Sequence, residues 1–392
     1  MARSVTLAPR RAWYGGEKLG GWWHALGDRL ICDVCPRGCA LGPGDRGYCR
    51  VRRNVDGRLV LDVYGQVAAV QVGLVETQPL HHFFPGSQVL SLGTVGCNLA
   101  CKFCGAWQLA LSRSMFRRLA STASPREIAV AAQRLGCHSV AFACNEPVPW
   151  LEFVIDTARW CRRLGIQTIA VTAGYVSPCA RAAFFRELDA VSVGLKGFSD
   201  PCYQRLTDAH LQPVLDALEW LRHETDVWLE ITTLVIPGVN DARDDIQRMA
   251  GWIVERLGPD VPLHFTAFHP DYRMRDRAST PPATLIDARE LAMQCGLQYV
   301  YTGNVADPDR QSTYCPGCGR LVIARNMYRV VEYGIRQGAC RHCGLAIAGR
   351  FGAELIRAAA SPSVSCRGLD PRSTQRLCDT LGFQSLRGGP PV

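Results

Sequence analysis

Three cysteines within a short loop form a metal-binding pattern that lacks a fourth ligand. They are Cys97, Cys101 and Cys104 in the stretch GCNLACKFCG, spaced Cys-x3-Cys-x2-Cys. We call residues 97–104 the three-cysteine loop. Three thiolates can hold three irons of a [4Fe–4S] cube and leave the fourth iron open for a small molecule, as catalytic zinc sites keep one open position. The alternative is a zinc site that takes its fourth ligand elsewhere in the chain.

A second set of cysteines lies near the N-terminus. This N-terminal cysteine group has the spacing Cys-x2-Cys-x3-Cys-x9-Cys and consists of Cys32, Cys35, Cys39 and Cys49. Glycines and Pro36 allow the tight turns that would bring four thiolates together. The uneven spacing fits a structural Zn²⁺ and a second iron–sulfur cluster equally well, so both interpretations stay open.

A third set lies near the C-terminus and has the spacing of a zinc ribbon. This C-terminal cysteine group pairs CPGC with CRHC and consists of Cys315, Cys318, Cys340 and Cys343. Two Cys-x2-Cys knuckles about twenty residues apart are typical of a tetrahedral thiolate site. Zinc is favoured here over a rubredoxin-like iron, and the metal would stabilise a module too small to build its own core.

The composition supports metal ligation over disulfide bonding. The chain has 392 residues and 19 cysteines, and no apolar run follows its basic N-terminus as it would in a secretory signal. No apolar stretch is long enough to span a membrane, so we expect a soluble, cytoplasmic protein. The net charge of +9 is spread along the chain, without the concentrated basic stripe of a nucleic-acid binder.

The segment between residues 86 and 305 must position the three-cysteine loop. In it, apolar runs of strand length alternate with segments of helical periodicity. Strands are expected at 87–94, 139–144, 166–172, 190–195, 227–237, 262–270 and 298–303, and helices at 124–136, 150–165, 178–187, 210–223, 241–257 and 284–295. Near-continuous apolar strands joined by helices indicate parallel strands buried on both faces. Either a doubly wound sheet or a complete or partial β/α barrel fits this pattern.

The helix expected at 124–136 carries strong end signals. Ser124 is a candidate N-cap, Pro125 takes the first helical position, and Glu127 completes a capping box. Gly136 is the expected stop.

Polar residues recur where the predicted strands end. They are Asn145, Glu146, Thr172, Lys196, Asn240 and His269. In β/α barrels this carboxyl edge carries the active site, so we expect these residues to surround the three-cysteine loop. The histidines His81 and His82 are interpreted instead as structural residues with satisfied hydrogen bonds.

The three-cysteine loop, with Phe103 before its last cysteine, resembles the signature of radical S-adenosylmethionine (radical SAM) enzymes. In that superfamily, the open iron of a [4Fe–4S] cluster chelates the methionyl part of S-adenosylmethionine. An electron then cleaves the cofactor and releases a 5′-deoxyadenosyl radical that abstracts hydrogen from the substrate. The resemblance implies the same cluster and cofactor here, with Phe103 among the cofactor-binding residues.

Other motifs extend this resemblance along the chain. NEP, with Asn145 and Glu146, resembles the loop that contacts the methionyl amine, and VTAG, with Thr172 and Gly174, resembles a Thr-Asn-Gly loop. GLK and FHP resemble motifs of pyruvate formate-lyase activating enzymes, which implies that Lys196 neutralises the cofactor's carboxylate and that His269 contacts the cofactor. Ala173 and Gly194 depart from those motifs, which removes the side-chain contacts that Asn and Asp would make.

Across roughly residues 20–352 the chain resembles the radical SAM enzyme of the AmmeMemoRadiSam system. The resemblance includes CDVCPRGC, PLHHFFPG, LKGFSDPCYQRLT and the C-terminal knuckles. Gly105 and Ala106 depart from the expected polar residues directly after the three-cysteine loop, which indicates a divergent member with a different substrate.

Together these observations predict an α/β protein, a partial (β/α)6-type TIM barrel with small cysteine-rich metal-binding modules at both ends. Its expected segments are 1–85 for the N-terminal cysteine-rich region, 86–305 for the barrel, 306–352 for the zinc-ribbon-like module and 353–392 for a C-terminal helix and tail. Expected partners are S-adenosylmethionine, an electron donor such as flavodoxin or ferredoxin, and a protein substrate or AmmeMemoRadiSam partner proteins, with no nucleic acid and no membrane. The alternative functions are a glycyl-radical-enzyme activase and a non-catalytic metal-binding scaffold.

Overall fold

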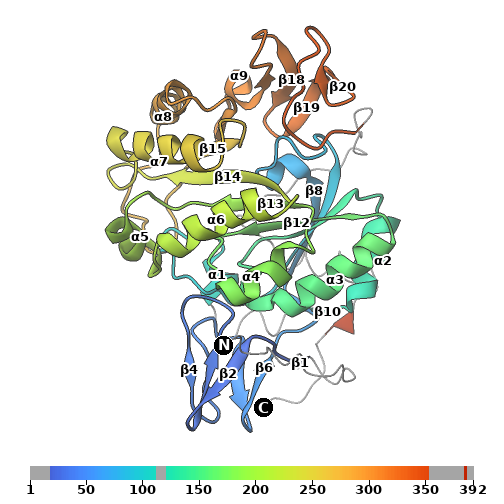
Figure 1. Cartoon of the computed structure of the whole chain (residues 1–392), viewed down its shortest axis with the longest axis vertical. Helices are drawn as coiled ribbons and strands as arrows, with labels where there is room; N and C mark the ends of the chain where they lie inside the picture. The colour runs from blue at the N-terminus through green and yellow to red at the C-terminus, as the bar shows by residue number, and fades with distance from the viewer. Residues whose placement is uncertain (1–17, 112–120, 353–383, 386–392) are drawn as a thin grey trace.

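The computed structural model describes residues 18–111, 121–352 and 384–385. Along the chain, N-terminal strands lead into a large sheet flanked by helices, and a small group of strands follows (Figure 1). The predicted helix and tail at 353–392 lie outside the described residues, apart from a two-residue strand. The segment boundaries expected at 85, 305 and 352 stay predictions.

An eight-stranded sheet forms the centre of the molecule. Its strands, in spatial order, are β16 (Val300–Gly303), β15 (Leu263–Ala267), β14 (Trp228–Val235), β13 (Ala190–Gly194), β12 (Gln167–Thr172), β11 (Ser139–Phe142), β9 (Gln88–Gly93) and β8 (Ala69–Leu74). The strand β8 is antiparallel to β9, and the other neighbours run parallel to each other.

The strand order distinguishes between the two expected sheet types. Strands that are neighbours in the sheet also follow one another along the chain, apart from the separate strand β10. The strand order therefore never reverses, whereas in a doubly wound sheet it does. Among the described strands, β8 and β16 do not pair with each other, so the sheet stays open. This singly wound α/β sheet is consistent with a partial barrel. Every strand predicted for it is confirmed, whereas β8 was not among the predicted strands.

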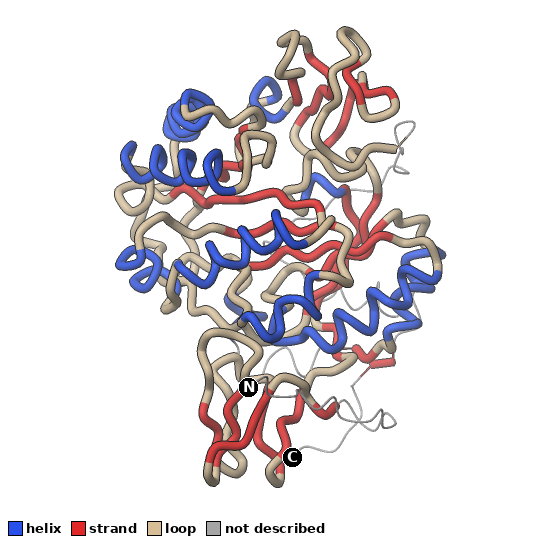
Figure 2. The backbone as a smooth tube through the Cα atoms, viewed as in Figure 1, coloured by secondary structure: helices blue, strands red, loops and turns tan. Residues whose placement is uncertain are grey.

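Helices connect the parallel strands and pack on the sheet (Figure 2). They are α2 (Pro125–Arg134), α3 (Leu151–Arg163), α4 (Pro178–Phe185), α5 (Asp200–Thr207), α6 (Gln212–Glu224), α7 (Arg243–Arg256) and α8 (Pro282–Gln294), with the shorter α1 (Trp107–Leu111), α9 (Pro308–Gln311), η1 (Val75–Thr77) and η2 (Val148–Trp150). For example, α3 packs against β12, and α8 packs against β15 and β16. The helix α5 was not predicted.

The helix α2 begins as its sequence predicts. The Ser124 side chain accepts a hydrogen bond from the Glu127 backbone (3.2 Å), and the Glu127 carboxylate accepts one from the Ser124 backbone (2.7 Å). After the helix, Gly136 has a φ of +67°, a conformation that glycine adopts without strain. The predicted capping box is therefore confirmed.

Short strands precede the central sheet in the chain, and two later strands, β10 and β22, form a sheet with one of them. They are β1 (Lys18–Leu19), β2 (Trp23–Leu26), β3 (Arg29–Cys32), β4 (Ala40–Leu41), β5 (Arg52–Val55), β6 (Arg58–Leu61), β7 (Gln66–Val67), β10 (Ser121–Thr122) and β22 (Gln384–Ser385). They form three small antiparallel sheets, ordered β1-β6-β5, β2-β3-β4 and β22-β10-β7.

One buried ion pair joins these strands to the central sheet. Arg52 of β5 is 1% exposed, and its guanidinium binds both carboxylate oxygens of Glu152 in α3, with Nη1 to Oε1 at 2.9 Å. It also donates to the carbonyl of Pro149 (3.0 Å). Burial alone would lower the pKa of Arg52, but the charge of Glu152 and its hydrogen bonds raise it, so the arginine stays charged.

The C-terminal strands pack on the edge of the central sheet. They are β17 (Thr313–Tyr314), β18 (Leu321–Asn326), β19 (Arg329–Tyr333), β20 (Ile335–Arg336) and β21 (Ala339–Cys340). Their small core consists of Tyr299, Tyr301, Cys315, Val322, Ile323, Ile335, Cys340 and Ile347. Because Tyr301 belongs to β16, the C-terminal cysteine group is built directly onto the last strand of the sheet.

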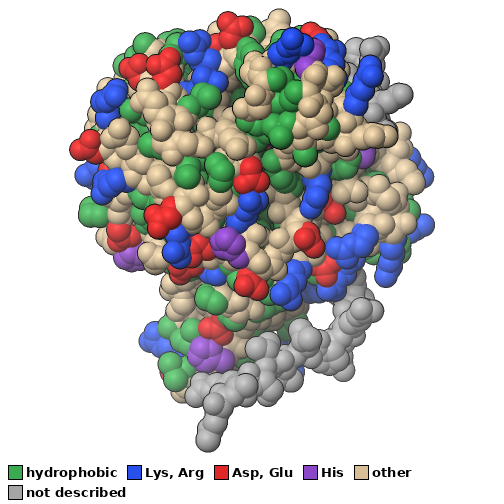
Figure 3. All heavy atoms as spheres, turned by 45° about the horizontal axis from the view of Figure 1, so that its top comes forward, with side chains coloured by type: hydrophobic (Ala, Val, Ile, Leu, Met, Phe, Trp, Pro, Cys, Tyr) green, Lys and Arg blue, Asp and Glu red, His purple; other side chains and the backbone are tan. Residues whose placement is uncertain are grey.

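The surface shows scattered charge. On the face in Figure 3, Lys and Arg side chains lie among Asp and Glu side chains and do not form one continuous basic patch. Within the described part of the chain, no helix combines the length and apolarity needed to cross a bilayer.

We expect Glu152→Gln to destabilise the protein by about 3–5 kcal/mol, because it leaves the buried Arg52 charge without its partner. The free energy of unfolding, measured by guanidinium titration, tests this. Glu219→Gln is the matched control, because Glu219 pairs with Arg256 at the exposed surface and its loss should change little. If both variants lowered the free energy of unfolding equally, the ion pair of Arg52 and Glu152 would not be what attaches the N-terminal strands to the central sheet.

Candidate active site

The three-cysteine loop, residues 97–104, lies beyond the carboxyl end of β9. Its backbone is held by helix α5, since the N–H of Ala100 donates to Thr207 O and the N–H of Lys102 donates to Leu206 O, both at 2.9 Å. The unpredicted helix α5 therefore sets the position of the loop relative to the strand ends.

Asn145 holds the start of this loop from the neighbouring strand β11. Its side-chain oxygen accepts a hydrogen bond from the Thr94 backbone (3.1 Å), and its amide nitrogen donates to Gly96 O (2.8 Å). Both ends of the amide are thus bound to backbone. Asn145 thus positions the backbone that leads into the three-cysteine loop, and its predicted contact with a cofactor stays a prediction.

Gly96, the residue directly before the loop, touches the N-terminal cysteine group. This glycine has a φ of +92°, and a Cβ atom there would lie 2.6 Å from the carbonyl oxygen of Cys49 and 2.7 Å from Val51 Cγ1. Only a residue without a side chain lets the two backbones approach this closely. The two cysteine clusters are therefore direct neighbours in space.

A buried carboxylate marks the strand ends beside the loop. Glu146, 5% exposed, accepts hydrogen bonds from Thr172 Oγ1 (2.5 Å), the Ala173 backbone (2.7 Å) and the Val148 backbone (3.2 Å). Burial raises the pKa of Glu146, and these hydrogen bonds partly oppose that shift. The backbone of Gly174 in turn donates to Thr172 Oγ1 (3.0 Å). The structure thus brings the predicted residues of the NEP and VTAG motifs together.

Lys196 lies two residues after β13, near enough for its charge to act on this carboxylate. Its positive charge acts against the effect of burial on the pKa of Glu146 and of Cys101. Asn240 holds the lysine's backbone, because its amide donates to Lys196 O (3.1 Å). A Cβ atom at position 194 would lie 2.1 Å from Lys196 Nζ. Glycine in place of the Asp of the related motif therefore leaves room for the ammonium group.

The three thiols of the loop are buried, and a metal would change their ionisation. Burial raises the pKa of Cys97, Cys101 and Cys104, that of Cys101 to about 12, so they would be protonated without a metal and deprotonated by one. Thiolates around a single zinc lie about 3.8 Å apart. Among the described residues, the sulfurs of this loop do not form a set within 4.8 Å.

Two predicted cofactor-binding residues lie apart from these contacts. Phe103, a residue of the loop itself, is buried in an apolar cluster with Phe268 and Met274. His269, just after β15, is exposed at the mouth of the sheet, and within the described part of the chain its ring has no hydrogen-bond partner. Their roles toward a cofactor stay predictions.

The N-terminal cysteine group has a wider spacing than a single-ion site. Cys32 ends β3, and its backbone N–H donates to the carbonyl of Cys39, the residue before β4, at 3.0 Å. Burial raises the pKa of Cys32 to about 11 and of Cys35 to about 12, and these thiols lie close enough to influence one another and Cys49. Within the described residues, however, the four sulfurs are not a set within 4.8 Å.

The C-terminal cysteine group has the geometry of one bound ion. Its four sulfurs all lie within 4.8 Å of one another, with Cys315 to Cys343 at 3.5 Å and Cys318 to Cys340 at 3.8 Å. These separations match the value of about 3.8 Å around a tetrahedral zinc. The group can therefore hold a metal ion.

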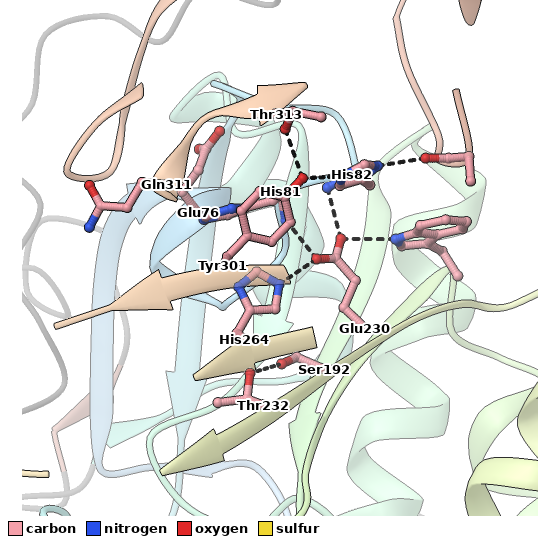
Figure 4. A network of polar contacts seen from close by, with 12 residues as sticks. Glu76, His81, His82, Ser192, Glu230, Thr232, His264, Tyr301, Gln311 and Thr313 are labelled. Carbon is pink, nitrogen blue, oxygen red and sulfur yellow. Dashed lines mark hydrogen bonds and ion pairs between the residues drawn. The ribbon is translucent and has the colours of Figure 1, made fainter. Parts of the chain in front are cut away.

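Sequence reasoning missed a polar cluster inside the sheet (Figure 4). His82 is structural as predicted, because its ring bonds the Ala348 carbonyl (2.6 Å) and the Tyr301 hydroxyl (2.5 Å). The prediction is wrong for His81, whose buried Nδ1 has no partner in the described structure. Glu230 and His264 are further members of the cluster. The available signal was a charged or titratable residue inside an apolar strand, in LEITT and LHFTA.

Comparison with known families gives a match over the segment that contains this site. The family model "Radical SAM superfamily" matches residues 91–252. The chain is also 35% identical, over 329 residues, to "Uncharacterized protein MJ0808" of Methanocaldococcus jannaschii, covering 82% of this chain and 96% of that protein.

Solved structures resemble parts of the chain. A domain of a pyruvate-formate lyase-activating enzyme from Bacteroides vulgatus is 19% identical with a TM-score of 0.38, covering 42% of this chain and 99% of that domain. A radical SAM methyltransferase from Sphaerobacter thermophilus is 15% identical with a TM-score of 0.45, covering 61% of this chain and 71% of that one.

We expect Gly96→Ala to be more destabilising than Gly44→Ala by about 1–3 kcal/mol, the usual cost of overpacking. Both glycines have positive φ, but a Cβ at Gly44 meets nothing within 4 Å, whereas one at Gly96 meets the Cys49 carbonyl. Guanidinium unfolding measures the difference. The Gly96→Ala variant should also retain less iron than the Gly44→Ala variant after anaerobic reconstitution. Equal stability and equal iron content in the two variants would contradict the close contact between Gly96 and Cys49.

Proposed function

The chain belongs to the radical SAM superfamily, and we propose that its three-cysteine loop holds a [4Fe–4S] cluster that cleaves S-adenosylmethionine. The observation that carries this proposal is the position of Cys97, Cys101 and Cys104 beside a buried carboxylate and a lysine at the strand ends. When bound, the cluster and cofactor of this superfamily supply a 5′-deoxyadenosyl radical that abstracts hydrogen from a substrate. The protein's own residues bind and orient the cofactor.

The charges at the strand ends complement the two ends of an amino acid. Glu146 is positioned by Thr172 and Ala173 to receive a cationic amine, and Lys196 offers the positive charge that a carboxylate requires. Gly174, with a φ of +68°, lets the VTAG backbone turn closely beside them. We assign these residues to the methionyl part of the cofactor. Phe103 and His269 are proposed to line the remainder of its site.

The substrate and partners are proposed from the motif resemblance alone. That resemblance supports a member of the AmmeMemoRadiSam group that modifies a small molecule or a protein, reduced by a donor such as flavodoxin or ferredoxin. An activase for a glycyl-radical enzyme is the alternative within the same chemistry. The buried carboxylate of Glu146 and the positive charge of Lys196 at the strand ends favour an enzyme over a metal-binding scaffold.

The two four-cysteine groups are proposed to bind different metals. The compact C-terminal cysteine group suits zinc, which would stabilise the small strands around it. The N-terminal cysteine group, with its wider spacing, suits a second iron–sulfur cluster. Its contact with Gly96, the residue directly before the three-cysteine loop, offers a short path for an electron to the catalytic site.

We expect Cys97→Ala, Cys101→Ala and Cys104→Ala each to reduce formation of 5′-deoxyadenosine to background, because two thiolates no longer secure the cluster. The assay uses anaerobically reconstituted protein, dithionite and S-adenosylmethionine, with the product measured by chromatography. Cys295→Ala is the control, since Cys295 lies outside all three groups and should leave product formation unchanged. Product at the wild-type level in the loop variants would refute the assignment.

A variant with all three loop cysteines replaced by alanine should still bind iron and acid-labile sulfide in equal amounts. The N-terminal cysteine group remains intact in it, and adding Cys35→Ala should remove that iron. Metal analysis and visible absorption measure both variants.

The C-terminal cysteine group provides the control for this metal analysis. Cys318→Ser should release zinc and leave the iron content unchanged. If the triple loop variant contains zinc alone, the N-terminal cysteine group is a zinc site and the proposal of a second cluster fails.

A further inference from the structure

One arginine of the N-terminal strands reaches the three-cysteine loop itself. Arg37 lies within the N-terminal cysteine group, between Cys35 and Cys39. Its Nε donates a hydrogen bond to the backbone carbonyl of Asn98 at 2.9 Å. Because Asn98 directly follows Cys97, the guanidinium group of Arg37 lies against the backbone beside a predicted cluster ligand.

The guanidinium group of Arg37 is held in one place by two further contacts. It lies over the ring of Tyr48, with its central carbon 3.6 Å from the ring centroid. Its Nη1 is 3.3 Å from Asp208 Oδ2, and the same oxygen accepts a hydrogen bond from the Tyr48 hydroxyl at 2.7 Å. The position of this positive charge is therefore fixed by an aromatic ring, a carboxylate and the loop backbone.

Asp208 connects this arrangement to the helix that holds the loop. It is the C-cap residue of α5 and has a left-handed backbone, with a φ of +56°. The two residues before it, Leu206 and Thr207, provide the carbonyls that accept hydrogen bonds from the loop backbone. Arg37 and the end of α5 therefore bind each other and the same loop.

The partner of Arg37 offsets its charge only in part. The side chain of Asp208 is 66% exposed, whereas that of Arg37 is 15% exposed. Water and salt screen the charge of an exposed carboxylate, but they screen a mostly buried charge much less. The Nη2 of Arg37 is enclosed and has no hydrogen-bond partner within the described structure. Since arginine keeps its proton at any ordinary pH, a permanent positive charge lies beside the loop.

We propose that Arg37 is a positioning residue that raises the reduction potential of an iron–sulfur cluster held by the three-cysteine loop. This inference rests on the proposed function. One-electron reduction by the donor adds one negative charge to a cluster, and a fixed positive charge nearby favours the reduced state. Through Arg37, the N-terminal cysteine-rich part of the chain sets how readily the loop's cluster accepts an electron.

Two substitutions change the local charge in opposite directions. Arg37→Gln removes the positive charge and should lower the reduction potential. Asp208→Asn removes the opposing negative charge and should raise it. Asparagine keeps an oxygen that can accept from the Tyr48 hydroxyl, and it tolerates a left-handed backbone. This second variant therefore tests the proposal even if Arg37→Gln fails to fold.

The measurement is a redox titration of anaerobically reconstituted full-length protein, followed by electron paramagnetic resonance. The signal of the loop's cluster is the one that Cys97→Ala lacks. At the potential where the wild-type cluster is half reduced, the ratio of reduced to oxidised cluster should fall by about tenfold in Arg37→Gln, as expected for the loss of one nearby charge. In Asp208→Asn the same ratio should rise.

Two control variants separate the charge from a packing role. Arg37→Lys keeps the charge but loses the planar group that stacks on Tyr48, so its potential should stay nearer to wild type than that of Arg37→Gln. Arg134→Gln makes the same change in net charge at the exposed end of α2. That end leads into the amino end of β11, at the opposite edge of the sheet from the loop, so its potential should be that of wild type.

The outcomes also separate this inference from the proposed function. If Arg37→Gln and Asp208→Asn keep the wild-type potential while wild-type protein forms 5′-deoxyadenosine, only the role of Arg37 is refuted. Equal potentials in Arg37→Gln and Arg37→Lys, both below wild type, would refute it as well, because they would indicate packing alone. Wild-type protein without a cluster signal that depends on Cys97 would refute the proposed function, and the role of Arg37 with it.

Discussion

Two buried arginines hold the structure together, and each requires a carboxylate in the central sheet or its helices. Arg52, from the N-terminal strands, binds Glu152 in α3, and Arg325, from the C-terminal strands, lies 3.6 Å from Glu76. Both guanidinium groups are 1% exposed. A buried charge without its partner costs several kcal/mol, so each small group of strands has one favourable position on the sheet.

These attachments explain why the metal groups lie where they do. The Arg52 pair brings Cys49 against Gly96. The N-terminal cysteine group therefore lies against the residue that leads into the three-cysteine loop. Arg325 inserts beside His81 and makes the C-terminal strands one wall of a cavity that His264 also lines.

The sequence predicted the features whose signals are local. Ser124 and Glu127 form the expected capping box, and the apolar runs form the expected strands, because these depend on neighbours in the chain. The helix α5 was missed, since its start at Ser199 and Asp200 lies in a short segment without a clear apolar period.

Contacts between distant residues could not be read from the sequence. Arg325 meets His81 across 244 positions, and Glu230 meets His264 across 34. A lone arginine or histidine in a sequence gives no sign of such a partner. Likewise, the cysteine spacings identified three groups, but only the sulfur positions separate the compact C-terminal cysteine group from the two wider ones.

The central claim is that the three-cysteine loop holds a cluster whose open iron takes S-adenosylmethionine. Electron paramagnetic resonance of the reduced, reconstituted protein tests it most directly, before and after addition of the cofactor. Because Glu146 and Lys196 lie beside the loop, the account predicts that the cofactor binds there and alters the signal of the reduced cluster. A spectrum that S-adenosylmethionine leaves unchanged would contradict the claim.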